Sequence, residues 1–458
     1  MERLSRLFWP VLVTPKNAVI KNVEAISRSQ KLLTELGLVR PGYNGTYQLM
    51  PLAQRVLDKC ADLVRRQMRS VGAQQITLPI LTPSELWKKS GRLDGDITEF
   101  YLLNDRHGKQ FLLSPTHEEA VTAMLASIAP ISYKQLPLRL FQIGPKFRDE
   151  LKPRFGLIRA KEFVMKDLYT FDRDAATALQ TYEQMNAAYN ALFQQLQVPF
   201  VKVEAATGMM GGSVSHEYHY LAATGEDQLI TCDSCGYAAN IETINEADSD
   251  KHCPRCKSTK LRSVTGIEVG HTFVLNDKYS KPLKATFLQE HGKPENLVMG
   301  CYGIGISRLV AAAVEVLATE TELRWPTLLA PFDVCIIGAK QGSKEEKLAN
   351  SVELEFCNAL SGICNEDDVL IDDRSNLTIG KRLLDAKRMG YPIVAVIGSK
   401  AAQPIPKVEL HLTTGDTMEV EPSEALALIA KHISHKRALY SIKQDISASA
   451  KSSKASIG

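Results

Sequence analysis

Two charged stretches of the sequence place arginine beside an aromatic residue in a way that could bind a nucleotide. Phe147-Arg-Asp-Glu150 ends one β-type run, and Arg159-Ala-Lys-Glu-Phe163 opens the next after a basic loop. An arginine in such sequence usually belongs to a salt bridge at the rim of a sheet. Here a nucleotide clamp is favoured, because guanidinium binds phosphate through two hydrogen bonds and a phenyl ring can lie against adenine.

A glycine-rich segment could bring a second phosphate-binding arginine to the same place. Gly300-Cys-Tyr-Gly-Ile-Gly-Ile-Ser-Arg308 runs into an apolar helix expected over Leu309–Leu317. Glycines let a strand approach a ligand closely, and an arginine just inside a helix adds a phosphate contact. The spacing differs from the dinucleotide-binding fingerprint, so the segment alone is a weak signal.

A third stretch, Leu113-Ser-Pro-Thr-His-Glu-Glu119, is typical of a turn that opens a helix. Thr116 and Glu118 could also have a purely structural role. The turn would then cap the helix, and acids in its first turn would interact favourably with the positive end of the helix dipole. It is not a zinc-protease helix, because no second histidine follows at the required offset.

Four of the nine cysteines form two C-x-x-C pairs. They are Cys232 with Cys235 and Cys253 with Cys256, with seventeen residues between the pairs. This spacing predicts a zinc ribbon with four thiolate ligands in a reducing compartment. The alternative is the stub of an excised domain with free thiols.

The length and composition of the chain predict a folded protein with more than one domain. The chain has 458 residues, of which 44% are hydrophobic and 23% charged, as in folded globular proteins. A net charge of +3 excludes a uniformly basic coat for nucleic acid and permits a local basic groove. No run approaches the ~18 apolar residues that a membrane span needs.

Hydrophobic periodicity predicts a large antiparallel sheet with flanking helices. Helices are expected over residues 56–71 and 176–197, and a short β-type run with Pro79 follows the first of them. Between Phe100 and Phe171, short β-type runs alternate with charged loops, as in antiparallel sheets. The cysteine pairs lie in a small insert at about 226–265.

Beyond Trp325 the pattern changes to that of a separate α/β domain. Phe332–Gly338 and Tyr391–Gly398 are near-continuous apolar runs, as in buried parallel strands. Helices are expected between them over 343–359 and 379–389, so strands and helices alternate.

Both ends of the chain are basic. The segment Leu4–Val13 is amphipathic and poor in acids, which indicates either an organelle import signal or a basic arm packed on the domain. The serine-rich segment from Lys436 to Gly458 is expected to be a flexible, solvated tail.

Together, the FRDE-type strand, the THEE turn and the GxGxSR segment resemble the motifs of class II aminoacyl-tRNA synthetases. The helix and strand that end at Pro79 resemble the first motif of that class, which forms the dimer interface. LSPTHEE, KFRDE-LKPRFGLIRAKEFVMKDLYTF, GGSVSHEY, GIEVGHTF, LKATF and MGCYGIGISR are similar to prolyl-tRNA synthetases of the bacterial and organellar type. The resemblance covers about residue 5 to residue 430 and is nearest to the animal mitochondrial form.

This resemblance implies an α+β class II catalytic domain over residues 1–325, with an antiparallel sheet and flanking helices. An α/β anticodon-binding domain over 326–435 and the tail over 436–458 would follow. It also implies a homodimer that converts proline and ATP to prolyl-adenylate and transfers the prolyl group to tRNA(Pro). Neither step needs a protein nucleophile, so catalysis is expected to rest on positioning and charge stabilisation.

The same resemblance implies the roles of individual residues toward ATP. Arg148 would hold the α-phosphate and Arg308 the γ-phosphate. Phe163 would stack on adenine, and Glu150 would accept from the adenine amino group. Magnesium would bridge the phosphates.

Toward proline, Glu118 would be the counter-ion of the ammonium and Thr116 its hydrogen-bond partner. His216, His271 and Phe273 resemble residues of the ring pocket, with a purely structural histidine as the alternative. Such a pocket should admit alanine and cysteine, because a missing methylene gives only ~1–3 kcal/mol of discrimination.

One departure from the family concerns editing. Bacterial relatives carry a large domain between the second and third motifs that hydrolyses alanyl-tRNA, and Glu217–Gly266 leaves no room for it. The chain is therefore expected to lack editing in cis, with the cysteine-bearing insert in its place.

In the second domain, Asp372-Asp-Arg374 and Gly380–Ala386 match the family's DDR and GKRxxDA patterns. The match implies that Arg374, Lys381 and Asp385 contact the anticodon, which is read by hydrogen bonds to splayed bases. An exposed salt-bridge cluster is the alternative.

The resemblance and the basic start predict the mitochondrial matrix as the location. Three other functions agree with part of the sequence, and particular residues argue against each of them. Intact Arg148 and Arg308 argue against a non-catalytic class II paralogue, and the THEE turn and nucleotide clamp argue against a zinc-ribbon nucleic-acid module. A threonyl enzyme would need an active-site zinc, for which Thr116 and Glu118 are not a ligand set.

Overall fold

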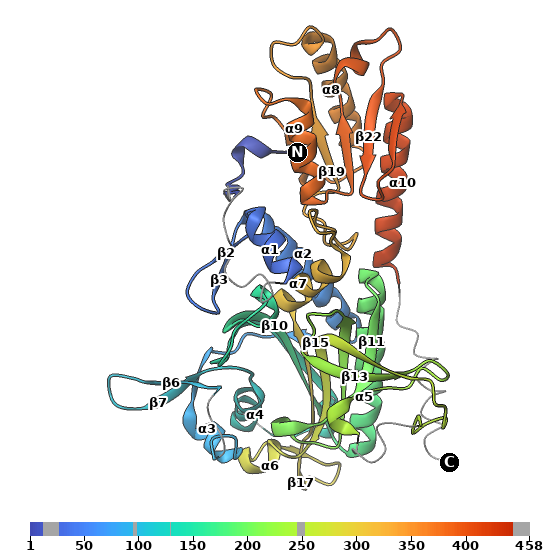
Figure 1. Cartoon of the computed structure of the whole chain (residues 1–458). Helices are drawn as coiled ribbons and strands as arrows, with labels where there is room; N and C mark the ends of the chain where they lie inside the picture. Colours follow the sequence, from blue (N-terminus) through green and yellow to red (C-terminus); the bar gives the residue numbers. More distant parts are fainter. Residues whose placement is uncertain (12–26, 95–98, 129, 245–251, 443–458) are drawn as a thin grey trace.

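The computed structural model describes residues 1–11, 27–94, 99–128, 130–244 and 252–442. A larger part with one extended sheet lies below a smaller α/β part in the view of Figure 1. The long helix α2 (Pro51–Ser70) lies between them, with apolar residues buried along its length.

The larger part is built on a nine-stranded sheet with the order β12-β11-β14-β13-β15-β18-β10-β9-β4. All neighbouring pairs are antiparallel except β11–β14 and β4–β9. The predicted antiparallel sheet is therefore confirmed. Its strands are β4 (Gln74–Gln75), β9 (Leu138–Phe147), β10 (Glu162–Asp172), β11 (Phe200–Glu204), β12 (Val214–Leu221), β13 (Asp227–Cys232), β14 (Ala238–Asn240), β15 (Leu261–Asn276) and β18 (Val298–Gly305).

Three helices cover one face of this sheet and bury its main core. They are α2, α5 (Ala175–Leu196) and α7 (Ile306–Leu317), close to the predicted helices. On α5, Tyr189 and Phe193 pack against Tyr218 of β12, with ring centroids 5.3 and 5.1 Å from it. This helix-covered face leaves the opposite face of β10, β15 and β18 to line a cavity.

Short elements surround the other end of the sheet. Pro79 interrupts the predicted run over 75–81, so that β4 holds two residues and the chain next pairs in a separate small sheet. The remaining elements of the larger part are α1 (Arg28–Glu35), β2 (Val39–Pro41), β3 (Tyr47–Leu49), β5 (Leu81–Pro83), α3 (Ser84–Lys89), β6 (Tyr101–Asn104), β7 (Gln110–Leu113), α4 (Glu118–Ser127), β8 (Ile131–Ser132), α6 (Ser280–Leu283), β16 (Thr286–Leu288) and β17 (Pro294–Asn296).

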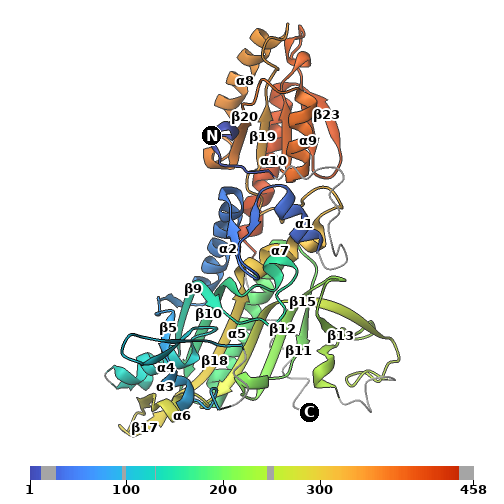
Figure 2. The ribbon, with the colours of Figure 1, turned by 60° about the vertical axis from the view of Figure 1, so that its left-hand side comes forward.

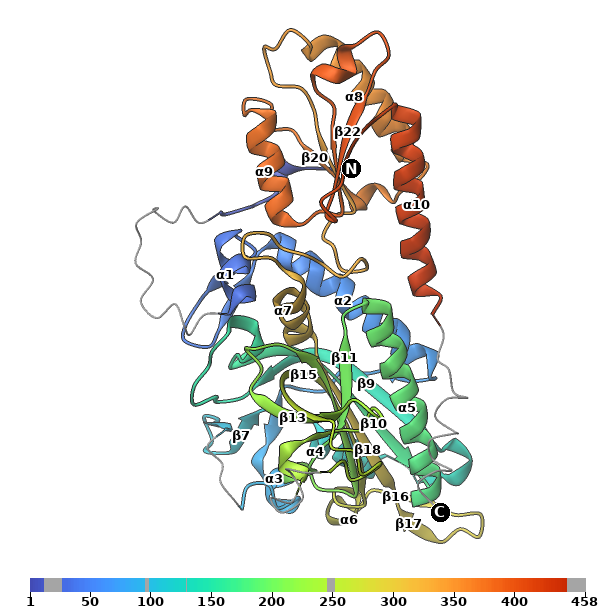
Figure 3. The same cartoon turned by 45° about the vertical axis from the view of Figure 1, so that its right-hand side comes forward.

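The C-terminal part is a six-stranded sheet with the order β1-β20-β19-β21-β22-β23. The first four strands run parallel, as the apolar runs predict, and the last two are antiparallel. Figure 3 shows α9 on one side of this sheet and α8 and α10 on the other. The elements are β1 (Glu2–Arg3), β19 (Val334–Ile337), α8 (Glu346–Leu360), β20 (Val369–Asp372), α9 (Ile379–Met389), β21 (Ile393–Val396), β22 (Val408–Leu412), β23 (Thr417–Val420) and α10 (Pro422–Tyr440).

The structure corrects both outer bounds of the predicted domains. Strand β1 belongs to the C-terminal sheet, so residues 1–325 do not form one domain. The tail does not begin at Lys436, because α10 continues to Tyr440. The Lys436 ammonium lies 2.7 Å from Oδ2 of buried Asp333, and this ion pair explains why a basic residue is buried there. Residues 443–458 of the predicted tail lie outside the described residues.

The first eleven residues form a packed arm, which was one of the two interpretations of the basic start. Leu4 is buried in the core that joins the two parts. The rest of the candidate import segment, from residue 12 onward, lies outside the described residues. None of the described helices is long and apolar enough to cross a bilayer.

Candidate active site

The hairpin of β9 and β10 places the predicted nucleotide clamp at one end of a cavity. The strands pair with Phe163 opposite Lys146, and Arg148 follows the end of β9. The Arg148 guanidinium carbon lies 5.3 Å from the Phe163 ring centroid. Arg308 stands in the first turn of α7, and its Nε donates to the Ile158 carbonyl at 2.8 Å. The two predicted arginines and the predicted aromatic residue are thus brought together.

This cavity has a volume of about 310 Å³, and a second, more polar cavity of about 200 Å³ adjoins it. Arg148, Arg308 and Glu268 line both. Glu150 lines the second cavity, where its Oε2 accepts from Arg159 Nε at 2.8 Å. Each of the four predicted ATP-binding residues therefore lines at least one of these two adjoining cavities.

The glycines of β18 have two different uses. Gly303 and Gly305 line the cavity, as expected for a strand that approaches a ligand. Gly300 does not, because a Cβ there would lie 2.6 Å from Tyr302 Oη and 2.7 Å from Thr170 Oγ1. Its missing side chain accommodates neighbouring protein atoms.

Glu268 balances the charge at the arginine end. Its Oε2 lies 3.3 Å from Arg308 Nη1, and its Oε1 lies 3.1 Å from His271 Nδ1. Burial alone would raise the pKa of Glu268, but the hydrogen bond from His271 and the charges of His271 and Arg308 hold that pKa far below its usual range. Burial and the neighbouring Arg308 lower the pKa of Arg148.

The other end of the cavity is formed by the THEE turn. Thr116 Oγ1 donates to the Glu118 carboxylate, at 2.7 Å from Oε2 and 2.9 Å from Oε1. Arg92 Nη1 lies 3.3 Å from Glu118 Oε2, and the Cys301 thiol donates to Oε1 at 3.0 Å. Glu118 is fully buried and lines the cavity. Its carboxylate therefore faces the cavity while Thr116, Arg92 and Cys301 contact it.

A buried polar network holds this turn from below. The Tyr169 hydroxyl accepts from the His117 amide at 2.8 Å and donates to Asp167 Oδ2 at 2.9 Å. Asp167 is compensated by Lys146, whose ammonium lies 2.9 Å from Oδ1. These buried hydrogen bonds and the ion pair restrict the geometry of the turn.

The structure separates the three residues predicted for the ring pocket. His271 and Phe273 line the cavity with stacked rings, 3.9 Å apart between centroids. His216 is not among the lining residues, because its ring lies on the helix-covered face and shares a 2.6 Å hydrogen bond with Tyr182 of α5. In the β12–β15 register, His216 pairs with Thr272 and Glu217 with His271. Alternation along the strand thus directs Glu217 toward His271 and His216 away from the cavity, so the structure does not bring His216 together with His271 and Phe273 in the cavity wall.

Sequence reasoning missed Arg92, Glu268 and Cys301. Two adjacent acids at the start of an otherwise apolar helix, Glu118 and Glu119, were a signal, because buried carboxylates need a cation nearby. Glu268 and Cys301 stood inside quoted motifs, but only the strand register shows that they face the cavity.

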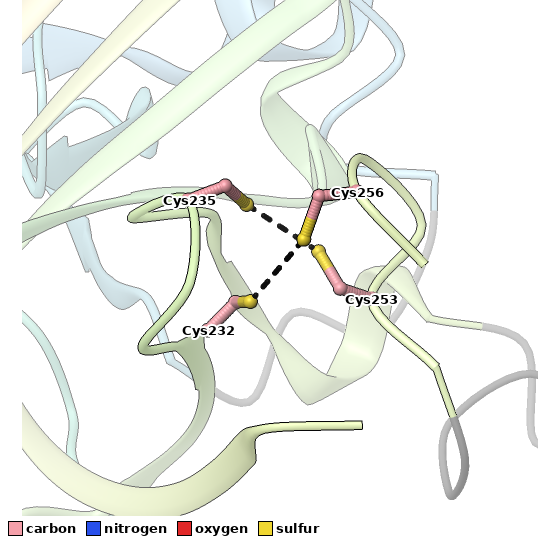
Figure 4. A group of neighbouring side chains, drawn as sticks. All are labelled: Cys232, Cys235, Cys253 and Cys256. Atoms are coloured by element: carbon pink, nitrogen blue, oxygen red, sulfur yellow. Dashed lines mark hydrogen bonds between the residues drawn. The ribbon is translucent and has the colours of Figure 1, made fainter. Parts of the chain in front are cut away.

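The four cysteines of the insert converge, as Figure 4 shows. The sulfur atoms of Cys232 and Cys256 lie 3.7 Å apart, and those of Cys235 and Cys253 lie 3.6 Å apart. Thiolates about 2.3 Å from a tetrahedral zinc ion lie about 3.8 Å from one another. The donor set and its spacing therefore fit zinc.

A second group of candidate metal ligands borders the active-site cavity. Ligand atoms of Glu217, Glu268 and His271 lie within 4.8 Å of one another. Carboxylate oxygens are the ligands that magnesium prefers, so Glu217 and Glu268 fit the ion expected with ATP.

The residues predicted to contact the anticodon form one cluster on the C-terminal part. Arg374 Nη2 donates to Asp372 Oδ2 at 2.6 Å, and its Nη1 to Asp385 Oδ2 at 3.2 Å. The Lys381 ammonium donates to Asp385 Oδ1 at 2.6 Å. Arg374, Lys381 and Asp385, which the sequence predicts to contact the anticodon, thus form a salt-bridge cluster, the alternative interpretation of the same residues.

The comparisons agree with this architecture. The family described as tRNA synthetase class II core domain (G, H, P, S and T) matches residues 101–317, and the family described as anticodon binding domain matches residues 333–432. The fold and the site thus define a class II aminoacyl-tRNA synthetase with a C-terminal anticodon-binding domain.

Over 404 residues the chain is 44% identical to the probable mitochondrial proline--tRNA ligase of Homo sapiens, covering 87% of this chain and 84% of that protein. It belongs to the proline--tRNA ligase family. A crystal structure of the prolyl-tRNA synthetase from Cryptosporidium parvum, complexed with halofuginone and AMPPNP, shares the fold. That likeness has a TM-score of 0.70 at 17% identity and covers 90% of this chain and 76% of the other.

A bacterial relative is longer than this chain within the matched region. The chain is 32% identical to the proline--tRNA ligase of Maridesulfovibrio salexigens over an alignment of 551 positions. That alignment covers 87% of this chain and 92% of the bacterial protein. Since this chain has 458 residues, the bacterial enzyme contains long segments without a counterpart here. The expected lack of a cis-editing domain fits this difference.

Proposed function

We propose that this chain activates proline with ATP and transfers the prolyl group to tRNA(Pro). The observation that carries the proposal is the distribution of charge in the cavity. Arg148 and Arg308 stand at one end, and the buried Glu118 with Thr116 stands at the other. ATP phosphates and the ammonium of an amino acid fit these two ends.

At the cationic end, Arg148 contacts the α-phosphate and stabilises the charge that develops there when the proline carboxylate attacks. Arg308 contacts the γ-phosphate, and Phe163 stacks on adenine. Glu150 accepts from the adenine amino group once Arg159 gives way to the nucleotide. Preorganised cations in a buried site stabilise a transition state strongly, because they need not reorganise during the reaction.

At the anionic end, Glu118 accepts from the secondary ammonium of proline, and Thr116 orients the carboxylate. His271 and Phe273 form the wall beside the pyrrolidine ring. Tyr169 and Asp167 act as positioning residues, because they hold the turn without lining the cavity. Arg92 is the counter-ion of the Glu118 carboxylate.

Magnesium, held by Glu217 and Glu268, would neutralise phosphate charge when bound. Zinc on the four cysteines would be structural, since four thiolates leave no open coordination position. Both assignments rest on the donor sets present in the chain.

The larger assembly follows the family. Residues 27–325 form the catalytic domain, with the cysteine-bearing insert over 226–265, and residues 326–442 together with β1 form the anticodon-binding domain. Arg374, Lys381 and Asp385 read the anticodon. The chain acts as a homodimer in the mitochondrial matrix, a location supported by the human relative's name, and it does not edit alanyl-tRNA.

Amino-acid-dependent exchange between ATP and pyrophosphate tests the activation step. The purified chain is assayed with proline, alanine, cysteine, threonine, histidine and glycine. Strong exchange with proline, and at most weak exchange with alanine or cysteine, is expected. Exchange with none of them, from folded protein that binds tRNA, would indicate a non-catalytic paralogue.

A further inference from the structure

The N-terminal segment, residues 1–11, contributes an edge strand, β1 (Glu2–Arg3), to the sheet of the anticodon-binding domain. Glu2 pairs with Leu370 and Arg3 with Ile371, parallel to β20. Figure 2 shows the N-terminus beside β20, far from the catalytic sheet. The chain therefore begins directly next to Asp372-Asp-Arg374, which follows β20.

This segment holds the middle residue of that motif. The Ser5 amide donates to Asp373 Oδ1 at 2.9 Å, and the Ser5 hydroxyl donates to Oδ2 at 2.6 Å. Arg3 Nη1 lies 3.8 Å from Oδ2. Burial would raise the pKa of Asp373, but the two hydrogen bonds from Ser5 and the charge of Arg3 keep that pKa below its usual value. Asp373 is thus held by the segment while Asp372 is paired with Arg374.

Trp9 supports the arginine of the same motif. The guanidinium carbon of Arg374 lies 5.2 Å from the Trp9 ring centroid. The Trp9 indole nitrogen donates to the Leu36 carbonyl, just beyond α1, at 2.6 Å. The ring therefore lies between the catalytic domain and the arginine predicted to read the anticodon, and it limits where that arginine can move.

Two exposed side chains, Arg6 and Phe8, lie in the chain between Ser5 and Trp9, which contact this cluster. Phe8 is 67% exposed. Arg6 is exposed and forms no ion pair with any residue in the described part of the chain. An exposed aromatic ring and an unpaired arginine in one short segment are residue types that bind unpaired bases, by stacking and by charge.

We propose that the N-terminal segment is part of the RNA-binding face of the anticodon-binding domain. Phe8 stacks on an unpaired base of the anticodon loop, and Arg6 contacts the neighbouring backbone phosphate. Ser5 and Trp9 act as positioning residues for Asp373 and Arg374. The inference rests on the proposed function, because it takes tRNA as the partner. Anticodon RNA is the expected occupant, because Phe8 and Arg6 belong to the same short segment as Trp9, whose ring lies against Arg374.

The test compares two steps of the reaction in single variants of the full chain. Phe8→Ala and Arg6→Ala probe contact, and Trp9→Ala probes positioning. Leu348→Ala and Lys347→Ala are matched controls, because both residues are exposed on α8, which covers the other side of the sheet. ATP–pyrophosphate exchange reports activation without tRNA, and aminoacylation and equilibrium binding use tRNA(Pro) transcript.

Phe8→Ala is expected to raise KM and Kd for tRNA roughly tenfold, in keeping with the loss of one base–aromatic stack, and to leave exchange unchanged. Arg6→Ala should reduce the salt dependence of binding by about one phosphate contact. Trp9→Ala should raise KM for tRNA with little change in kcat, and Trp9→Phe should recover most of the loss. Neither control should change KM for tRNA.

Unchanged tRNA affinity in Phe8→Ala, Arg6→Ala and Trp9→Ala, with normal charging, would overturn the inference. A wild-type chain that exchanges no pyrophosphate with proline would instead refute the proposed function. The two failures are distinct, because exchange does not involve tRNA.

Discussion

Arg92 Nη1 lies 3.3 Å from Glu118 Oε2 and 3.4 Å from Glu119 Oε2. Both carboxylates are fully buried, so one cation faces two anions. Burial and the charge of Glu118 raise the pKa of Glu119, while Arg92 and a hydrogen bond from Ser90 oppose this rise. Glu118 is the member of the pair that lines the cavity.

Glu118→Gln should therefore raise KM for proline roughly 10- to 100-fold, because a hydrogen bond to a charged group contributes about 1.5–3 kcal/mol. Glu119→Gln is the matched control, since it removes the same charge beside Arg92 without facing the cavity. KM for proline in the exchange assay should change less than about twofold in that variant. Equal effects in both variants would mean that overall charge, and not contact with substrate, sets the affinity.

Arg148→Lys and Arg308→Lys should each slow proline-dependent exchange by about 10²–10³-fold. Lysine retains the charge but cannot form the two parallel hydrogen bonds of a guanidinium to phosphate. Arg154→Lys, in the exposed loop between β9 and β10, serves as control and should exchange at the wild-type rate. Full activity in Arg148→Lys would remove that residue from the proposed phosphate site.

His271→Ala should lower kcat/KM for proline at least about tenfold, since it removes a wall of the cavity and a partner of Glu268. His216→Phe should leave kcat/KM within about twofold of wild type and lower only the thermal stability. Burial lowers the pKa of His216 to about 3, so the neutral ring is a structural partner of Tyr182 at working pH. Steady-state exchange kinetics and melting curves distinguish these outcomes, and a selective loss of activity in His216→Phe would contradict the observed register.

Purified protein should contain one zinc ion per chain by elemental analysis. Cys253→Ser and Cys256→Ser should reduce the zinc content to near zero and lower the melting temperature, because zinc binding contributes to folding. Cys357→Ser, on α8, is the control and should retain the metal. Wild-type protein refolded with excess zinc and found metal-free would identify the insert as a stub with free thiols.

Asp172 should make stability depend on pH. Burial raises its pKa to about 6, and the hydrogen bond from Thr181 and the charge of Arg139 only partly offset that rise. Because the folded-state pKa lies above the unfolded value, the native state binds the extra proton between about pH 4 and 6, and this contribution to stability is lost as pH rises through that window. Asp172→Asn should avoid the loss and gain about 3 kcal/mol relative to wild type between pH 4 and 7.

Melting temperatures of wild type and Asp172→Asn from pH 4 to 7 check this expectation. Asp174→Asn is the control, because the contribution of Asp174 to stability depends on pH in the opposite direction. A hydrogen bond from the Thr177 amide lowers the pKa of Asp174, so its contribution to stability is present at neutral pH and lost as pH falls. Parallel curves for wild type and Asp172→Asn would contradict the assignment.

The sequence by itself determined the fold class, the family and most of the residues proposed to bind ATP. Phe163, Arg148 and Arg308 stand in short contiguous motifs, and the structure places these motifs in one hairpin and at one helix start. The helix over 379–389 was predicted with its observed bounds, and the structure shows Thr378 as its N-cap and Gly390 as its C-cap. Local signals of this kind need no knowledge of distant contacts.

Only the tertiary structure decided which side chains meet across distant segments. His216 and Glu217 are neighbours in the sequence, and the register of β12 against β15 alone determines which of them faces the cavity. The pairing of Arg92 with Glu118 joins residues 26 positions apart, and that of Ser5 with Asp373 joins residues 368 positions apart. The basic start and Lys436 had the composition of solvated ends, but strand pairing and a buried aspartate hold them in the fold. The composition of a segment indicates whether that segment could form a core by itself. Whether it pairs with a distant segment depends on partners that only the folded chain brings together.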